Sequence, residues 1–215
     1  MKIGILGSGD VAQTLAAGFL AHGHEVMLGT RDPAKLNDWS AKHPKARVGS
    51  FADSAAFGEI GVLAVKGGAA EAVLKSADAS RHLAGKVLID ATNPIADLPP
   101  DNGVLRFFTT LDDALMERLQ RAHPVVKFVK AFNSVGAALM IDPKLPGGRP
   151  TMFICGDDAG AKATVTTLLA EVGWDTADMG VAAAARAIEP LCMLWCIPGF
   201  LRNDWVHAFK LVSPA

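Results

Sequence analysis

Short hydrophobic runs recur along the chain, and segments with the spacing of amphipathic helices separate them. The runs predict strands near residues 2–6, 24–28, 47–50, 60–65, 86–90, 125–129, 151–155 and 175–178. The segments between them predict helices near residues 10–22, 33–42, 51–57, 68–77, 110–122, 134–140 and 158–172. Strands that alternate with helices form βαβ units. We therefore expect an α/β fold with a doubly wound, mostly parallel sheet.

Capping and turn residues mark the ends of these predicted elements. Asp32, Thr110 and Asp157 each precede a predicted helix and are residue types that favour an N-cap. Residues 91–109 and 141–150 are rich in Pro, Gly, Asn and Asp, which predicts loops that follow strands rather than linkers between domains.

The last part of the chain, from about residue 181 to 215, has a helical composition. Pro190 and the pair Pro198-Gly199 interrupt it, so two or three kinked helices are expected there. A chain of 215 residues has an ordinary length for one α/β domain. We therefore expect residues 1–215 to form a single domain whose short helical tail caps the sheet or contacts a second subunit in a homodimer.

Composition narrows the classes of function. Half of the residues are hydrophobic, a fifth are charged and the formal net charge is −1, which argues against a nucleic acid partner. Cys155, Cys192 and Cys196 lie in apolar surroundings without the spacing of a disulfide framework or a metal site, which favours a cytoplasmic protein. We find no hydrophobic run of the roughly eighteen residues that span a bilayer, and expect no membrane segment.

A glycine-rich turn follows the first predicted strand. Its sequence is Gly7-Ser8-Gly9-Asp10-Val11-Ala12, a G-x-G-x-x-A pattern between a predicted strand and a predicted helix. In a Rossmann-like fold the first glycine permits the tight turn, the second lets a pyrophosphate approach the backbone, and the small last residue packs the helix on the strand. The N–H groups that open the helix bind the phosphates. These six residues are predicted to bind a dinucleotide.

The end of the second predicted strand indicates which dinucleotide binds. An acidic side chain there would accept the ribose hydroxyls of NAD, but this chain has Gly29-Thr30-Arg31. Arg31 can bind a 2′-phosphate through two hydrogen bonds, Thr30 can donate its hydroxyl, and Lys35 adds a positive charge nearby. The carboxylate of Asp32 is assigned to capping the next helix. The pattern therefore favours NADP(H).

The loops after strands four, five and six should line the nicotinamide, because ligands of open parallel sheets lie beyond the carboxyl ends of the strands. These loops place Val65, Lys66, Asn93, Pro94 and Asn133 among the candidate cofactor contacts. The asparagine amides could hydrogen-bond a carboxamide or a substrate. No catalytic residue is identified; the candidates are Lys66, Asn93, Asn133 and His207, the last one only if the tail folds back.

Several motifs together resemble those of the NADPH-dependent reductases of the deazaflavin coenzyme F420 and of the related cytoplasmic oxidoreductase domain of six-transmembrane metalloreductases. The motifs occupy residues 4–12, 29–33, 90–94 and 129–133, with Gly156-Asp157-Asp158 and Glu189-Pro190-Leu191 nearer the C-terminus. The resemblance implies a single Rossmann-type domain that transfers hydride between NADPH and a small-molecule acceptor, either a flavin or a deazaflavin. It also implies that Thr30 and Arg31 contact the 2′-phosphate.

Two other functions remain open. A non-catalytic module that binds NADP and regulates a partner would need the same fold, because the fold alone does not prove turnover. A small imine or carbonyl reductase would share the N-terminal glycine motif. Reductases of that kind add a long helical dimerisation domain, and the tail of about thirty residues from position 181 is short for that role.

Overall fold

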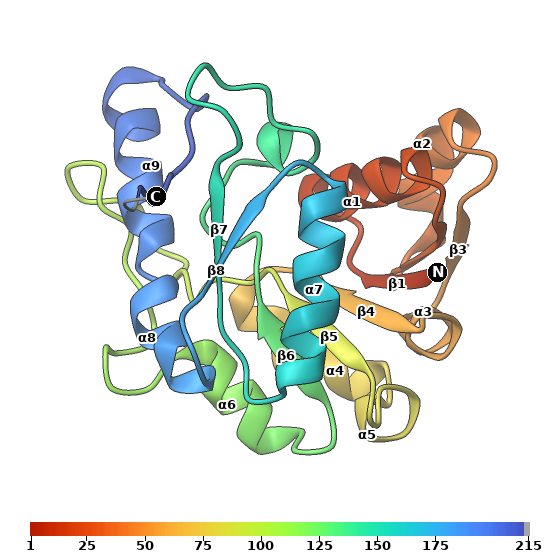
Figure 1. The fold of residues 1–215 in the computed structure, drawn as a ribbon. Coiled ribbons are helices and arrows are strands. Elements are labelled where there is room, and N and C mark those ends of the chain that lie inside the picture. The colour runs from red at the N-terminus through yellow and green to blue at the C-terminus, as the bar shows by residue number, and fades with distance from the viewer. Residues whose placement is uncertain (213–215) are drawn as a thin grey trace.

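The computed structural model describes residues 1–212 and has a central sheet with helices on both faces (Figure 1). Six strands pair in the order β3-β2-β1-β4-β5-β6, and all of the pairs are parallel. The strands are β1 (Lys2–Leu6), β2 (Glu25–Gly29), β3 (Arg47–Gly49), β4 (Ile60–Leu63), β5 (Val87–Asp90) and β6 (Lys127–Lys130). This is the strand order of the Rossmann fold, with the switch point between β1 and β4. The predicted fold class is confirmed.

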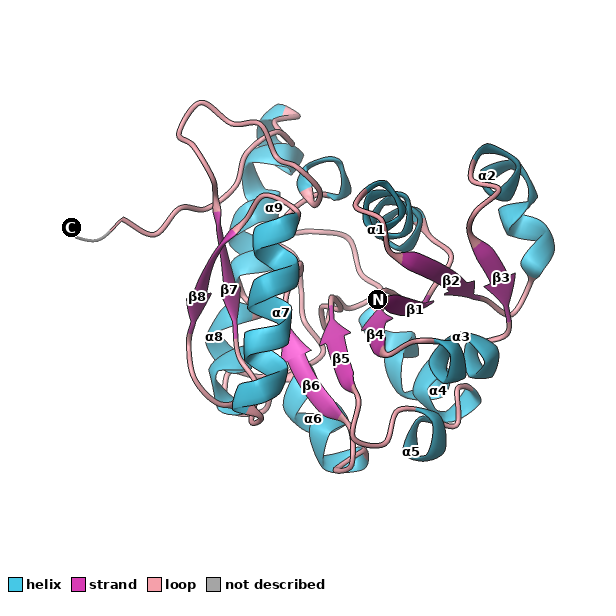
Figure 2. Ribbon diagram, turned by 45° about the vertical axis from the view of Figure 1, so that its right-hand side comes forward, coloured by secondary structure: helices cyan, strands magenta, loops and turns pink. Residues whose placement is uncertain are grey.

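Two further strands, β7 (Thr151–Ile154) and β8 (Asp175–Asp178), form a separate parallel pair. One antiparallel bridge, between Lys130 and Cys155, joins this pair to β6 at the edge of the main sheet. Figure 2 shows the pair beside β6, with α7 (Ala159–Glu171) alongside. All eight predicted strands are therefore present, but they form two sheets.

The alternation of side chains along the strands divides the hydrophobic core in two. Val62 and Ile89 pack with α1 (Asp10–Ala21) and α7, whereas Leu63 and Leu88 pack on the opposite face. The helices of that second face are α3 (Phe51–Phe57), α4 (Ala70–Ser76), α5 (Ala79–His82), α6 (Leu115–Ala122) and α8 (Ala185–Ile188). Both faces of the sheet are thus buried, as the continuous hydrophobic runs require.

The helix predicted at 110–122 is shorter than expected and begins at Leu115. Thr110 is not its N-cap, because Thr110 forms an isolated bridge with Asp113 in a tight turn before the helix. Ala114 occupies the N-cap position, and its N–H donates to Glu117 Oε2 at 2.9 Å. The carboxylate of Glu117, the third residue of α6, therefore caps the start of the helix in place of the expected Thr110 hydroxyl.

Capping predictions at two other helices have different outcomes. Asp32 caps the 3₁₀ helix η1 (Pro33–Leu36) by accepting from the Ala34 N–H, as predicted, and α2 (Asn37–Lys42) follows it. Asp157 does not cap α7. Its neighbour Asp158 accepts from the Ala161 N–H at 2.7 Å, while Asp157 accepts from Ala182 N–H at 2.9 Å and ties the tail to the end of β7.

The helix predicted at 134–140 reduces to the 3₁₀ turn η3 (Ala137–Leu139). The segment passes against the C-terminal tail, where Gly136 lies so close to the Trp195 ring that a Cβ atom would overlap it. A short turn η2 (Gly67–Ala69) likewise opens the helix predicted at 68–77. Close packing thus limits helical length at both places.

The C-terminal tail contains kinked helices, as predicted. After the turn η4 (Ala182–Ala184), α8 and α9 (Leu191–Arg202) meet at Pro190, and Pro198 lies inside α9. Residues 203–212 then return along α9, where Trp195 Nε1 donates to His207 O at 2.8 Å and His207 Nε2 lies 2.9 Å from Trp195 O. Two reciprocal contacts therefore hold residues 203–212 to α9.

The helical stretch Ala182–Arg202 is long and apolar enough to cross a membrane, by length and composition only. Arg186 and Glu189 interrupt this stretch, which is why it does not appear as a continuous hydrophobic run in the sequence. In the structure the stretch carries Glu189, which is 1% exposed and forms a buried ion pair with Lys130, and the stretch packs on α6. The absence of a membrane segment stays a prediction.

The three cysteines differ in burial and in the pKa of their thiols. Burial raises the pKa of Cys155 to about 12. On α9, a hydrogen bond between the Cys192 and Cys196 thiols raises the pKa of Cys192, which burial raises further, and lowers that of half-buried Cys196. Since the thiolate is the reactive form, Cys196 is the most reactive of the three.

The close approach of α3 to β1 predicts a strong effect of Gly4→Ala. A Cβ atom at Gly4 would overlap the carbonyl of Ser54 on α3, so this substitution should lower the free energy of unfolding by about 1–3 kcal/mol. Gly147→Ala is the matched control, because a Cβ at Gly147 meets no atom within 4 Å. Chemical denaturation followed by circular dichroism measures both, and equal stabilities would contradict the packing described for Gly4.

Thiol labelling tests the burial of the cysteines. In the folded protein at pH 8, iodoacetamide should modify Cys196 first, while Cys155 and Cys192 stay protected until denaturant is added. Peptide mass spectrometry at successive times identifies the modified residue. Labelling of Cys155 as fast as Cys196 in the native state would show that the bridge between β6 and β7 is open to solvent.

Candidate functional site

The predicted phosphate-binding turn lies between β1 and α1. Gly7 has φ 153°, and a Cβ atom there would overlap Ala64 O at the end of β4, so only glycine fits. Gly9 is the N-cap of α1, and a Cβ atom there would meet nothing within 4 Å. Among residues 1–212, no side chain caps α1. The opening N–H groups of α1 therefore face open space that suits a pyrophosphate.

The end of β2 closes against this turn. Gly7 N–H donates to Gly29 O at 3.0 Å, and Thr30 Oγ1 donates to Ser8 Oγ at 3.2 Å. Thr30 also accepts from the Asp32 N–H at 3.2 Å, which shapes the turn into η1. Thr30 is therefore buried as part of the turn, at 5% exposure, rather than free on the surface.

Positive side chains surround the turn at the end of β2. Arg31 and Lys35 are both exposed, and within the described part of the chain neither forms an ion pair. Asp32, the acidic residue in this segment, is directed to the N–H of Ala34. The residues present thus fit the 2′-phosphate form of a dinucleotide, because two cations stand where an NAD site has a carboxylate.

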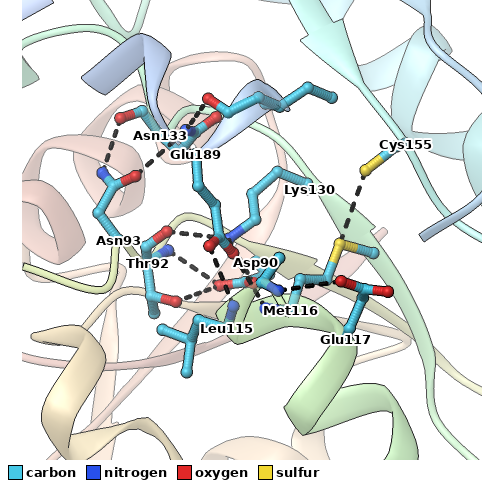
Figure 3. Close-up of polar contacts among 12 residues, drawn as sticks. Asp90, Thr92, Asn93, Leu115, Met116, Glu117, Lys130, Asn133, Cys155 and Glu189 are labelled. Atoms are coloured by element: carbon cyan, nitrogen blue, oxygen red, sulfur yellow. Dashed lines mark hydrogen bonds and ion pairs between the residues drawn. The ribbon is translucent and has the colours of Figure 1, made fainter. Parts of the chain in front are cut away.

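Asn93 and Asn133, which follow β5 and β6, contact each other at the carboxyl end of the sheet. Asn93 Nδ2 donates to Asn133 O at 2.7 Å, and Asn133 Nδ2 donates to Asn93 Oδ1 at 3.2 Å and to Ile188 O at 3.0 Å (Figure 3). Phe132 has φ 62°, an unusual conformation for a bulky residue that turns Asn133 away from the strand direction. The two amides form one fixed polar group, as strand-end residues of a cofactor site require.

A buried charge cluster lies directly beneath the asparagines. The strand register pairs Asp90 with Lys130, so both side chains point to the same face of the sheet. Lys130 Nζ lies 2.7 Å from Asp90 Oδ2 and 3.0 Å from Glu189 Oε1, and it donates to Thr92 O at 2.9 Å. The three charged side chains are at most 2% exposed (Figure 3). We call Asp90, Lys130 and Glu189 the charge cluster.

Each carboxylate of the charge cluster has further donors. Glu189 accepts from the N–H groups of Leu115 and Met116 at the start of α6, both at 3.0 Å. Asp90 Oδ1 accepts from the N–H and hydroxyl of Thr92, at 2.9 and 2.6 Å. Burial lowers the pKa of Lys130, but the two carboxylates outweigh burial and raise that pKa above its usual value. Lys130 is therefore a permanent cation.

The remaining predicted site residues lie in different places. Pro94 is buried next to Asn93, Val65 is partly buried beyond β4, and Lys66 is exposed at the start of η2. His207 stacks on Trp195 with ring centroids 4.9 Å apart, and its ring nitrogens contact Trp195 and Asp204 of the tail. His207 thus fastens the tail to α9, and its contacts do not join it to the glycine turn or the asparagines.

A hollow of about 450 Å³ lies between the loop before α6 and the C-terminal helices. Its walls include Phe107, Leu111, Arg186, Pro190 and Met193, and Glu189 of the charge cluster also borders it. Ile188, the neighbour of Glu189, is bonded to Asn133. The hollow therefore borders Glu189, whose neighbour in sequence contacts Asn133, and its volume is in the range of small-ligand pockets.

The sequence interpretation missed the charge cluster as a functional unit. Asp90 and Lys130 were noted only within the family motifs, and Glu189 only before Pro190. A signal was nevertheless present, since each of two buried strands ends in one charge of opposite sign at an equivalent position. Glu189 could not be added, because its place depends on the path of the tail over α6.

Comparisons of sequence and fold identify relatives of this chain among NADP-dependent oxidoreductases. Residues 2–94 match the family described as NADP oxidoreductase, coenzyme F420-dependent. The F420-dependent NADP reductase of Methanothermobacter marburgensis is 30% identical, and the match covers 98% of this chain and 99% of that protein. Metalloreductase STEAP3 of Rattus norvegicus is 32% identical over 93% of this chain, which spans only 39% of that longer protein.

Solved structures extend the comparison. A crystal structure from Arthrobacter sp. FB24, described as a putative F420-dependent NADP reductase, superposes with a TM-score of 0.92 at 36% identity, and the match covers 99% of this chain and 100% of that one. An imine reductase of Myxococcus stipitatus in complex with NADP⁺ has a TM-score of 0.69 at 16% identity and shares the fold. With full-length coverage of two such reductases, the chain belongs to the family of F420-dependent NADP oxidoreductases.

Proposed function

We propose that the protein is an NADP(H)-dependent oxidoreductase that transfers hydride between NADPH and a flavin-like or deazaflavin acceptor. The observation that carries the proposal is the uncapped start of α1 facing the glycine turn, with Thr30 and Arg31 beside it. Family membership supports the cofactor and the reaction class. Bound there, the nicotinamide would supply the hydride, and the chain would supply the binding groups.

The chain's own residues would orient the cofactor rather than exchange protons with it. Gly9 and the N–H groups of α1 would hold the pyrophosphate, and Arg31 with Lys35 would hold the 2′-phosphate. Asn93 and Asn133, fixed against each other, would hold the nicotinamide end. Stacked ring-to-ring hydride transfer depends chiefly on proximity and orientation, so a general acid is not required. Lys66 is left as an exposed charge that could attract an anionic substrate.

The hollow beside Glu189 supports a second ligand next to the nicotinamide site. Phe107 and Met193 offer apolar surface for a flat ring, and the polar part of the wall includes Arg106 and Arg186, which pair with Asp101 and Glu117. A small-molecule acceptor of the flavin class suits such walls. The tail exposes the apolar side chains of Leu194, Leu201 and Val206, which supports a homodimer. A cytoplasmic location is also part of the proposal.

An acceptor panel tests the reaction. The protein is mixed with NADPH and, separately, with a deazaflavin, FAD, FMN, a quinone or a cyclic imine, and the nicotinamide absorbance band is followed. We expect loss of the band with a deazaflavin or flavin. Tight NADPH binding without oxidation by any acceptor would favour a regulatory module, and oxidation by the imine alone would favour an imine reductase.

Arg31→Ala tests the choice of cofactor. The loss of a charge-assisted hydrogen bond to the 2′-phosphate should weaken NADPH binding by about 1.5–3 kcal/mol and leave NADH binding nearly unchanged. Arg81→Ala, which removes an exposed arginine on α5, is the matched control. Titration calorimetry gives the four dissociation constants. Equal losses for NADPH and NADH would show that Arg31 does not contact the 2′-phosphate.

A further inference from the structure

The charge cluster has one more negative than positive side chain. Every group around the carboxylates of Asp90 and Glu189 is a hydrogen-bond donor, namely the Lys130 ammonium, backbone N–H groups and a threonine hydroxyl. The ammonium and the N–H groups cannot accept a hydrogen bond, and the Thr92 hydroxyl, which could, donates to Asp90 Oδ1, so we treat both groups as carboxylates. With Lys130 as the sole cation within hydrogen-bonding distance in the described contacts, the cluster carries a net charge of −1.

The excess charge is only partly offset. The opening N–H groups of α6, which point at Glu189, contribute roughly half a positive charge at most. The side chains of Asp90, Lys130 and Glu189 are 0%, 0% and 2% exposed, so water and dissolved ions screen them weakly. A negative potential therefore extends from the cluster toward whatever lies next to it.

Two short paths, each made of one hydrogen bond and one step along the chain, connect the charge cluster to the asparagine pair. Lys130 Nζ bonds the carbonyl of Thr92, which is the residue before Asn93. Glu189 follows Ile188, whose carbonyl accepts from Asn133 Nδ2. The negative cluster is thus one residue from both amides that face the proposed nicotinamide.

We infer that the charge cluster stabilises the oxidised, cationic form of the nicotinamide and so makes bound NADPH a stronger hydride donor. When a hydride, one proton with two electrons, leaves the dihydronicotinamide for the flavin-like acceptor, the ring gains one positive charge. A fixed negative charge nearby favours that change over its reverse. The inference rests on the proposed function, because it needs the nicotinamide beside Asn93 and Asn133.

Dissociation constants of NADP⁺ and NADPH measure this bias without turnover. Wild-type protein should bind NADP⁺ about tenfold more tightly than the charge-neutral variant Glu189→Gln does, with NADPH binding unchanged within about twofold. The ratio of the two constants then shifts about tenfold, which corresponds to about 30 mV in the potential of the bound two-electron couple. Asp90→Asn removes the same charge from the other side of Lys130 and should give the same shift.

Glu117→Gln is the matched control. Glu117 lies on the same helix α6 and binds Arg186 through two hydrogen bonds of 2.9 and 2.8 Å, but the Arg186 side chain is 43% exposed to solvent. Its removal should change the ratio by less than about twofold. Circular dichroism and thermal melting establish which variants are folded. If neither buried variant folds, the wild-type ratio decides, with NADP⁺ expected to bind more tightly than NADPH.

The outcomes separate the inference from the proposed function. Failure of wild-type protein to bind either NADP⁺ or NADPH would overturn both. Binding of both forms, with weakening by Asn133→Ala but an unchanged ratio in Glu189→Gln and Asp90→Asn, would overturn the inference alone. Equal weakening of NADP⁺ and NADPH by the buried variants would show a structural role without electrostatic bias and would also overturn it.

Discussion

The cross-strand contact between Asp90 and Lys130, completed by Glu189, determines how the functional end of the domain is assembled. It brings together β5, β6, the start of α6 and the junction of α8 with α9 around one ammonium group. Replacing Lys130 would leave two buried carboxylates without a cation, and breaking a buried ion pair in this way typically costs about 3–5 kcal/mol. The same contacts hold the loops that carry Asn93 and Asn133, so the stability of this region and the geometry of the site have a common cause.

Much of the fold could be predicted because local patterns agree with it. Buried parallel strands read as hydrophobic runs, and the glycine turn at residues 7–12 has few structural interpretations between a strand and a helix. Helix starts were harder. Thr110 and Asp157 are residue types that favour an N-cap. In the structure, however, Thr110 lies in a turn where it is bridged to Asp113, and the Asp157 carboxylate accepts from the Ala182 N–H. The second of these contacts joins residues that are distant in sequence.

The candidate site shows the same division. Thr30 and the glycines were found because their tasks follow from local backbone geometry. The charge cluster was not, because it depends on strand register and on the route of the tail, neither of which has a local signature. His207, a candidate only if the tail folds back, shows the reverse case, because its ring nitrogens contact Trp195 and Asp204 and not the other candidate residues. Register and chain path, rather than residue type, were the missing information.

The bridge between Lys130 and Cys155 joins the β7–β8 pair to the main sheet through the backbone, and the two sheets also share a hydrophobic core that includes Met152 and Ile154. The backbone of Lys130 holds the β7–β8 pair to the main sheet, while its side chain holds the two carboxylates. Separation of the two sheets at this seam would move that one residue and admit water to a region that excludes it. Detachment of the β7–β8 pair at this bridge would therefore also open the charge cluster to solvent.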